Sequence, residues 1–135
     1  MSYQKRFLLD TNIILRFLLA DHPTLSKKAK NIFKEAEKGE IELFVNHTTI
    51  AEVFWVLESF YQLSRQELIQ ILSDFLRFPN LRVTDKRMIL KTFNLLAREN
   101  VSYIDAYNLI FARKNNLELK TFDRKLEKLA REKKN

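Results

Sequence analysis

The chain has 135 residues, of which 46% are hydrophobic and 30% charged, and it contains no cysteine. This composition is typical of one globular domain with a substantial core, and it excludes disulfides, catalytic thiols and thiolate metal sites. The net charge of +7 has two equally good explanations. The protein binds a polyanionic partner such as nucleic acid, or the charge only keeps the protein in solution.

The first apolar run is KRFLLDTNIILRFLLADHP, residues 5–23. Its pattern predicts a short buried strand over residues 5–9 and then an amphipathic helix. Between residues 7 and 19 the run is interrupted by Asp10, Asn12 and Arg16, and it is shorter than the ~20 apolar residues that a membrane span needs. No small-residue cleavage site follows it. We therefore expect a cytoplasmic protein that does not associate with membranes.

The rest of the chain alternates between helix and strand patterns, in the order typical of an α/β domain. Further strands are predicted over residues 41–46, 81–84 and 117–121. Helices are expected over residues 24–38, 49–61, 65–77, 86–98, 103–114 and, in a basic tail, 124–135. The sequence thus predicts a single domain over residues 1–135, with a central, mainly parallel sheet of four short strands flanked by helices.

Four acidic residues follow these strands or begin the helices after them. Asp10 ends the first strand, Glu52 lies in the first turns of the helix after the second strand, Asp105 begins the helix over 103–114, and Asp123 follows the fourth strand. Ligands of open parallel sheets gather beyond the carboxyl ends of the strands, so these positions are candidates for a site. Taken singly, each acid is more readily explained as a helix cap or as part of a capping box, as in the pairs Thr49/Glu52 and Ser102/Asp105.

Glu52 is the acid that a cap explains least well. It is the only polar residue between Ile50 and Leu57, and a helix that is apolar on nearly every side is expected to be buried. Three of the four acids also belong to the same expected edge of the sheet, where carboxylates repel one another. A divalent cation removes that repulsion, and oxygen ligands without cysteine suit Mg²⁺ or Mn²⁺.

Other chemistries fit the sequence poorly. A single glycine excludes a phosphate-binding P-loop and a dinucleotide fingerprint. The two histidines, His22 and His47, lie beside a turn and just after a strand, where surface positions are more common than metal ligands. Ser, His and Asp all occur, but no nucleophile elbow does.

Together, these acids and their surroundings resemble the PIN-domain nucleases, and most closely the toxins of VapBC-type toxin–antitoxin pairs. The resemblance covers nearly the whole chain and is carried by LLDTNIILRFLLAD, Glu52, YIDAYNLIFARKNN and ELKTFDRKLEKL. It implies a PIN-like three-layer fold. Members of this family often have a short fifth strand after the last helix, and the resemblance leaves open whether this chain has one.

The resemblance also implies a function, a Mg²⁺- or Mn²⁺-dependent endoribonuclease. The catalytic and metal-binding acids carried over from it are Asp10, Glu52, Asp105 and Asp123. The resemblance assigns Thr11, Asn12 and Thr121 to orienting the neighbouring carboxylates, and Arg16 and Arg124 to contacting RNA phosphate.

Two partners besides RNA are implied by the same resemblance, a cognate antitoxin protein and a second copy of the chain in a homodimer. Large apolar residues in the segments 49–61 and 103–112 fit a self-association face, and they fit equally well an ordinary core. Two other functions remain open. One is a housekeeping PIN nuclease that processes RNA without an inhibitor. The other is a non-catalytic RNA- or protein-binding module whose acids only cap helices.

Overall fold

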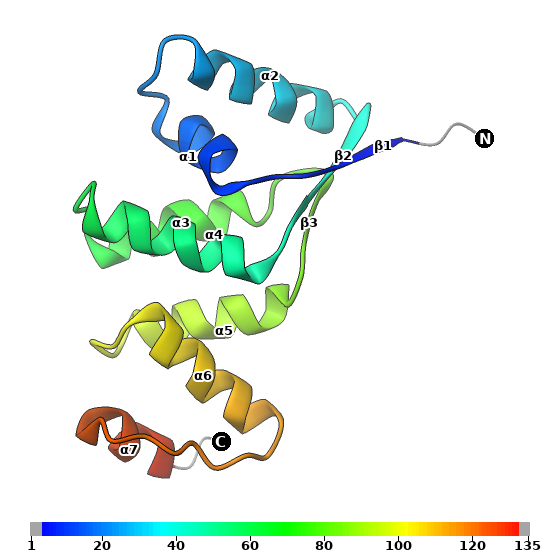
Figure 1. The fold of residues 1–135 in the computed structure, drawn as a ribbon. Coiled ribbons are helices and arrows are strands. Elements are labelled where there is room, and N and C mark those ends of the chain that lie inside the picture. Colours follow the sequence, from blue (N-terminus) through cyan, green and yellow to red (C-terminus); the bar gives the residue numbers. More distant parts are fainter. Residues whose placement is uncertain (1–3, 133–135) are drawn as a thin grey trace. The chain divides into compact units, whose positions relative to one another are not determined.

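The computed structural model describes residues 4–132, and the chain forms two compact units, Met1–Lys86 and Arg87–Asn135. Figure 1 shows that the three strands belong to the first unit, whereas the second is built from helices and their connections. Among the described residues, no helix is long and apolar enough to cross a membrane. The assignment of residues 1–135 to one domain stays a prediction.

The first unit is an α/β fold with a parallel sheet flanked by helices. Its strands are β1 (Lys5–Leu8), β2 (Ile41–Val45) and β3 (Leu81–Val83), in the spatial order β1-β2-β3. The central strand pairs with β1 and β3 in parallel, and Leu43 lies opposite Phe7 on one side and Leu81 on the other. All three strands therefore end at the same edge of the sheet.

Four helices complete this unit: α1 (Thr11–Leu19), α2 (Leu25–Glu37), α3 (His47–Ser59) and α4 (Arg65–Phe75). Helix α1 packs against α2 and α3, α3 packs against α4, and α2 packs against β2. These helices agree with the sequence prediction to within two residues at nearly every end. Only α2 lacks a side-chain cap from its own N-cap residue, Thr24. The imidazole Nδ1 of His22 substitutes for it by accepting the amides of Thr24 and Leu25 at 3.3 and 2.9 Å.

An aromatic cluster holds α1, α2 and the end of α4 together. Phe33 of α2 is 1% exposed and lies at its centre. Its ring stacks on Phe17 of α1 with centroids 3.9 Å apart, and it meets Phe75 and Phe78 edge-on at 5.8 and 5.2 Å. Offset and edge-on pairs of this kind add to the stabilisation that burial alone supplies.

The first strand is more exposed than predicted. All four residues of β1 are exposed, and the side chain of Leu8 is 69% exposed. The expectation of a buried strand over residues 5–9 is therefore wrong except at Leu9, which is buried and donates its amide to Phe44 O at 2.9 Å. The apolar run could not reveal this, because β1 is the end strand of the described sheet.

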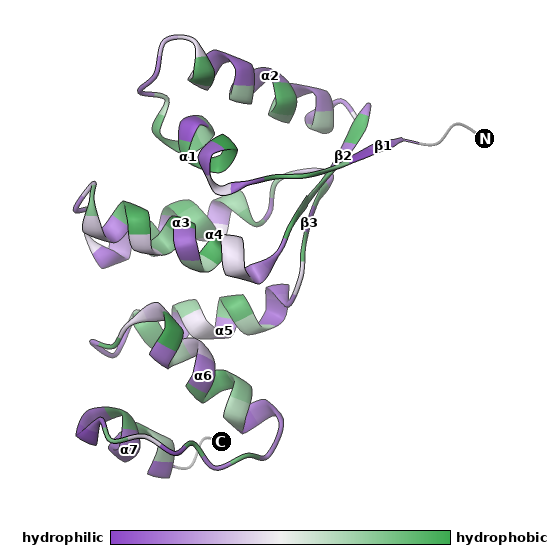
Figure 2. Ribbon diagram, in the orientation of Figure 1, coloured by the Kyte–Doolittle hydropathy of each residue, from purple (hydrophilic) through white to green (hydrophobic). Residues whose placement is uncertain are grey.

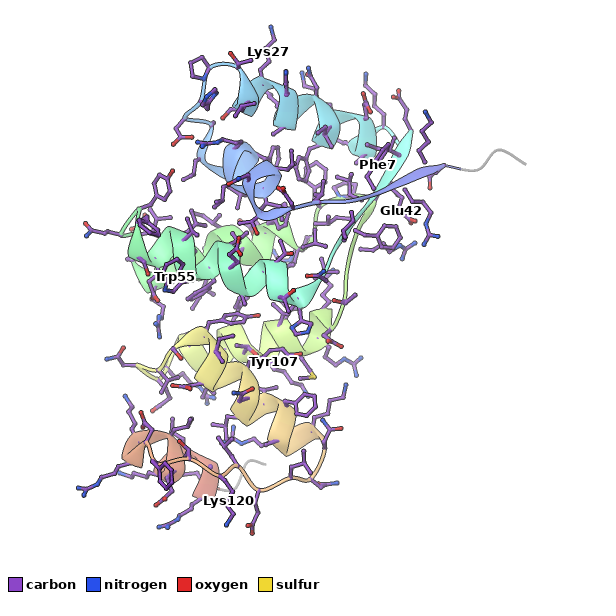
Figure 3. All side chains as sticks on the ribbon, viewed as in Figure 1. Phe7, Lys27, Glu42, Trp55, Tyr107 and Lys120 are labelled. Atoms are coloured by element: carbon purple, nitrogen blue, oxygen red, sulfur yellow. The ribbon has the colours of Figure 1, made fainter. Side chains whose placement is uncertain are left out.

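A charged ladder crosses one face of the sheet. Glu42 on β2 accepts hydrogen bonds from Arg82 on β3 at 3.0 Å and from Arg6 on β1 at 3.4 Å; Figure 3 labels Glu42. The bond from Arg82 is the main reason why the pKa of this carboxyl lies below its ordinary value. The guanidinium of Arg6 also lies over the ring of Phe44 on β2, at 4.6 Å.

Two turns meet where β2 and β3 begin. Gly39, which ends the turn after α2, has φ +81°. Asn80, just before β3, has φ +59° and donates from Nδ2 to Ala36 O at 2.7 Å. Glycine and asparagine suit these left-handed positions, since other side chains are strained there.

We expect Asn80→Ala to destabilise the protein by about 2 kcal/mol. The substitution removes a hydrogen bond worth about 1 kcal/mol and places an ordinary side chain in a left-handed conformation. Asn80→Gly is the matched control, because it removes the same hydrogen bond but tolerates the backbone, and it should cost about half as much. Urea unfolding of the three proteins measures both steps; equal losses for Ala and Gly would contradict the backbone part.

The second unit contains most of α5 (Lys86–Leu96), together with α6 (Tyr103–Lys114) and α7 (Arg124–Arg131). Phe93 of α5 meets Tyr103 of α6 with ring centroids 6.2 Å apart, and burial raises the pKa of Tyr103. Arg113 of α6 donates from Nη2 to Leu129 O on α7 at 2.9 Å. Burial, with a smaller contribution from Arg98, lowers the pKa of this guanidinium.

The strand predicted over residues 117–121 is wrong, so the described chain has three strands and not four. The segment LELKT alternates as a strand does, but it is an unpaired connector between α6 and α7. Its first amide, Leu117 N, donates back to Ala112 O at the end of α6. Alternation is a local property, whereas a strand needs a pairing partner. A fifth strand would fall beyond α7, where residues 133–135 lie outside the described part of the chain.

Candidate active site

The carboxyl edge of the sheet carries a polar residue after each strand. Asp10 follows β1, Asn46 follows β2 and Thr84 follows β3. This edge is where parallel sheets present their ligands. Because the strands are parallel and adjacent, the three residues arise from one side of the first unit.

Asp10 is the N-cap of α1. Its Oδ1 accepts the amides of Asn12 and Ile13 at 2.9 and 3.3 Å. The second carboxylate oxygen, Oδ2, has no hydrogen bond or ion pair with the described residues of the unit. Asp10 is exposed although apolar residues surround it in the sequence, because Leu9 before it turns into the core. The prediction that Asp10 caps a helix is thus confirmed, and capping uses only one of the two carboxylate oxygens.

Glu52 lies in the second turn of α3 and is exposed, so the expectation of a buried glutamate is wrong. The core side of α3 is formed by Val53, Phe54 and Leu57, whereas Trp55 is 56% exposed and is labelled in Figure 3. Helix α3 carries apolar residues on its exposed side as well as on its buried side. The amino-acid composition of the helix therefore does not show which side faces the core. Among residues 4–86, the described part of its unit, the Glu52 carboxylate has no hydrogen-bond or ion-pair partner.

The predicted capping box of Thr49 and Glu52 is not formed. The N-cap of α3 is Asn46, whose Oδ1 accepts the amide of Thr49 at 3.1 Å and the hydroxyls of Thr48 and Thr49 at 2.6 and 3.0 Å. The helix therefore begins at His47, two residues earlier than predicted. Glu52 is left without a capping role.

The same edge carries further polar residues that were not among the predicted site residues. Thr84 Oγ1 accepts the amide of His47 at 3.0 Å, and His47 Nε2 lies 3.9 Å from Asp85 Oδ2. Asp85 has φ +57°, in the left-handed region. The available signal was a polar residue at or just after the end of each predicted strand; the sequence prediction considered only acidic residues and so left out Asn46 and Thr84.

The second unit holds the other two candidate acids. Asp105 lies in the first turn of α6, half-buried, and its amide donates to the N-cap hydroxyl of Ser102 at 3.1 Å. Asp123 is exposed and is the N-cap of α7, with its carboxylate accepting the amide of Leu126 at 2.9 Å. Among residues 87–132 of this unit, the side chain of Asp105 and the second oxygen of Asp123 have no hydrogen-bond or ion-pair partner.

Three residues were predicted to orient the neighbouring carboxylates: Thr11, Asn12 and Thr121. Thr11 is half-buried and Asn12 exposed, both in the first turn of α1 beside Asp10. Thr121 accepts the backbone amide of Asp123 at 3.1 Å, so it orients the main chain before α7.

The two arginines expected to contact phosphate also differ. Arg16 lies 3.4 Å from Asp21 Oδ1 in an ion pair, whereas Arg124 is exposed at the start of α7. The hydroxyl of Tyr61 lies 3.5 Å from the other oxygen of Asp21.

The four acids share one electrostatic feature. None of them forms a salt bridge with the described residues of its own unit, although the chain has 24 Lys and Arg against 17 Asp and Glu. Other acids, such as Glu42, Glu58 and Asp74, do pair with arginines. Within the described residues, neither unit by itself gathers three or more His, Asp or Glu side chains into a metal site. A cluster of all four acids stays a prediction.

A parallel sheet flanked by helices, with polar residues at its carboxyl edge, places the chain among α/β proteins of the kind that bind ligands at strand ends. Residues 7–132 match the family model of the PIN domain, and the chain belongs to the PIN domain family. PIN domains are generally nucleases, and those nucleases generally use divalent metals such as Mg²⁺. The matched region contains all four candidate acids. No curated protein matches the sequence.

Proposed function

We propose that this protein is a divalent-metal-dependent endoribonuclease and the toxin of a type II toxin–antitoxin pair. Membership of the PIN family supports nuclease activity. The observation that carries the proposal to particular residues is that Asp10, Glu52, Asp105 and Asp123 form no salt bridge with the described residues of their own unit. In a chain of net charge +7, four carboxylates without a salt bridge to the described residues of their unit are available for a cation.

The donor atoms fit Mg²⁺ or Mn²⁺. All are carboxylate oxygens, which hard divalent cations prefer. Asp10 and Asp123 each use one oxygen as a helix cap and keep the other without a hydrogen bond in its unit. Helix capping and metal binding are therefore compatible at the same residue. A bound cation would supply an acidified water and would offset negative charge on the phosphate.

The chain's own residues would complete the chemistry. A carboxylate that does not touch the metal can accept the proton of the attacking water, as a general base. Arg16 and Arg124 are proposed to bind phosphate oxygens, because a guanidinium group can donate two parallel hydrogen bonds to one phosphate. Thr11, Asn12 and Thr121 are proposed to position Asp10 and Asp123, which they adjoin.

We also propose an antitoxin and a second copy of the chain as partners in the cytoplasm. Exposed aromatic residues support protein binding by the first unit: Trp55 and Phe60 are 56% and 70% exposed, with ring centroids 5.3 Å apart. In the second unit, Ile104 and Phe111 of α6 are 55% and 45% exposed. Apolar surface of this kind often marks an interface.

Cleavage of a mixed RNA pool tests the enzymatic proposal. We expect purified protein to cut RNA with Mg²⁺ or Mn²⁺ and to stop when EDTA is added. Metal should also raise the melting temperature, since a ligand at 100 times its dissociation constant adds about 2.7 kcal/mol of stability. No cleavage together with no thermal shift would favour a binding module whose acids only cap helices.

Expression in cells without a partner separates the two nuclease functions, because a toxin should arrest growth and a housekeeping nuclease should not.

A further inference from the structure

A row of lysines runs along the outer side of α2. Its members are Lys27, Lys30, Lys34 and Lys38, the last of which is the C-cap of the helix. Residues three or four apart lie on one face of a helix, so the four ammonium groups follow one another over about 16 Å. All four lysines are exposed, and Figure 3 shows Lys27 directed away from α1. The opposite face of α2 is buried through Ala29, Phe33 and Ala36.

In the described part of the chain these lysines are not held in ion pairs, although the same helix also carries the exposed Glu35 and Glu37. Other helices neutralise their charges locally, as Arg77 does with Asp74 at 3.3 Å and Arg131 with Glu127 at 3.0 Å. Figure 2 shows hydrophilic positions recurring along α2 between the hydrophobic ones. A solvated polar face needs only polarity, whereas a run of one sign attracts a chain of the opposite sign.

A pocket adjoins the N-terminal end of the row. It has a volume of about 640 Å³ and lies in the first unit at the turn between α1 and α2. Its lining includes Phe17, Asp21, His22, Pro23, Lys27 and Lys30. The last two lysines also belong to the row, so a charged track leads directly into a partly apolar pocket. Pockets of about 300–1,000 Å³ suit small molecules or one unit of a polymer.

The pocket lies at the far end of α1 from Asp10. Asp10 caps the first turn of this helix, and Ala20, its C-cap, lines the pocket. The nine residues of α1 lie between the two caps, which are therefore about 15 Å apart along the helix axis. Both ends belong to the first unit, and Arg16 lies between them on α1.

We propose that the lysine row and its pocket form a binding track for single-stranded RNA, with phosphates along the four lysines and one base in the pocket. This proposal rests on the proposed ribonuclease function and adds a place where the substrate is held outside the acidic residues. Single-stranded RNA matches both features, because its backbone presents a regular series of negative charges and its unpaired bases are free to enter a pocket.

Binding of a fluorescein-labelled single-stranded RNA, measured by anisotropy in EDTA over a series of NaCl concentrations, tests the track. The variant Lys27→Gln/Lys30→Gln/Lys34→Gln/Lys38→Gln should bind roughly tenfold more weakly at low salt. The slope of log K against log salt should fall by about 3, since each phosphate contact on a single strand contributes about 0.7. The charge-matched control replaces four exposed basic residues off the row: Lys28→Gln, Arg77→Gln, Lys114→Gln and Lys128→Gln. It should change the slope by less than about 1.

Competition experiments distinguish RNA from other polyanions. Inorganic polyphosphate of matched charge should compete less well than RNA, because it offers no base for the pocket. Equal losses in the row variant and the control, stronger competition by polyphosphate, or tighter binding to phosphatidylserine-containing vesicles would each overturn the track. Since the assay contains EDTA, it is independent of catalysis: RNA that binds through the row but is never cleaved would contradict the proposed function and leave the track in place.

Discussion

Asp10→Asn is expected to abolish metal-dependent RNA cleavage while leaving the fold intact. The loss in kcat/KM should be about 10²- to 10⁴-fold, the size of effect that a positioned catalytic carboxylate commonly has. Stability should change by less than about 0.5 kcal/mol, because asparagine is as good an N-cap as aspartate. Oδ1 of the amide can accept the same two amides that Asp10 accepts now, at 2.9 and 3.3 Å. Cleavage rates and melting temperatures of the two proteins measure both effects.

Asp74→Asn provides the control for this experiment. Asp74 is exposed on α4 and pairs with Arg77, and it lies outside every proposed role. This variant should cleave as the wild type does, and Mg²⁺ should raise its melting temperature equally. In Asp10→Asn, the rise with Mg²⁺ should disappear. A folded Asp10→Asn protein with full activity would remove Asp10 from the active site.

Phe33→Ala is expected to cause the largest loss of stability, about 3–5 kcal/mol. Phe33 is 1% exposed and contacts three other aromatic rings, so truncation leaves a cavity between α1, α2 and the end of α4. Much of the stability of a domain of this size would be lost, since typical values are about 5–15 kcal/mol. Urea unfolding measures the change.

Two probes localise this effect. Trp55 is the only tryptophan and lies in the first unit, so its fluorescence reports on that unit, whereas circular dichroism reports on the helices of both. The surface variant Phe60→Ala should cost less than about 1 kcal/mol, because this side chain is 70% exposed. A loss below about 1.5 kcal/mol for Phe33→Ala would mean that the aromatic cluster is not tightly packed.

The helices were predictable because their signals are local. Ser102 caps α6, and the range predicted for that helix, residues 103–114, coincides with Tyr103–Lys114. The start of α3 was missed by two residues because Asn46, a good cap, was assigned to the strand before it. The strand predicted over 117–121 failed for a non-local reason, because alternation in a segment does not show whether another strand pairs with it.

The candidate site was predictable in its residue types and less so in their surroundings. Asp10 and Asp123 were foreseen both as caps and as possible ligands, and the structure shows the caps. The burial of Glu52 was misjudged, since an apolar sequence does not reveal which side of α3 faces solvent. The predicted cluster of four acids depends on tertiary packing, which no local pattern encodes.

The cap at Asp10 has a consequence for the evolution of this protein. One carboxylate oxygen caps the helix, the other has no partner among the described residues of its unit, and asparagine would cap the helix equally well. The substitution Asp10→Asn would therefore abolish the proposed catalysis without destabilising the fold. An inactive descendant would persist as a folded protein with its surfaces unchanged, able to occupy RNA or a partner in place of the active form.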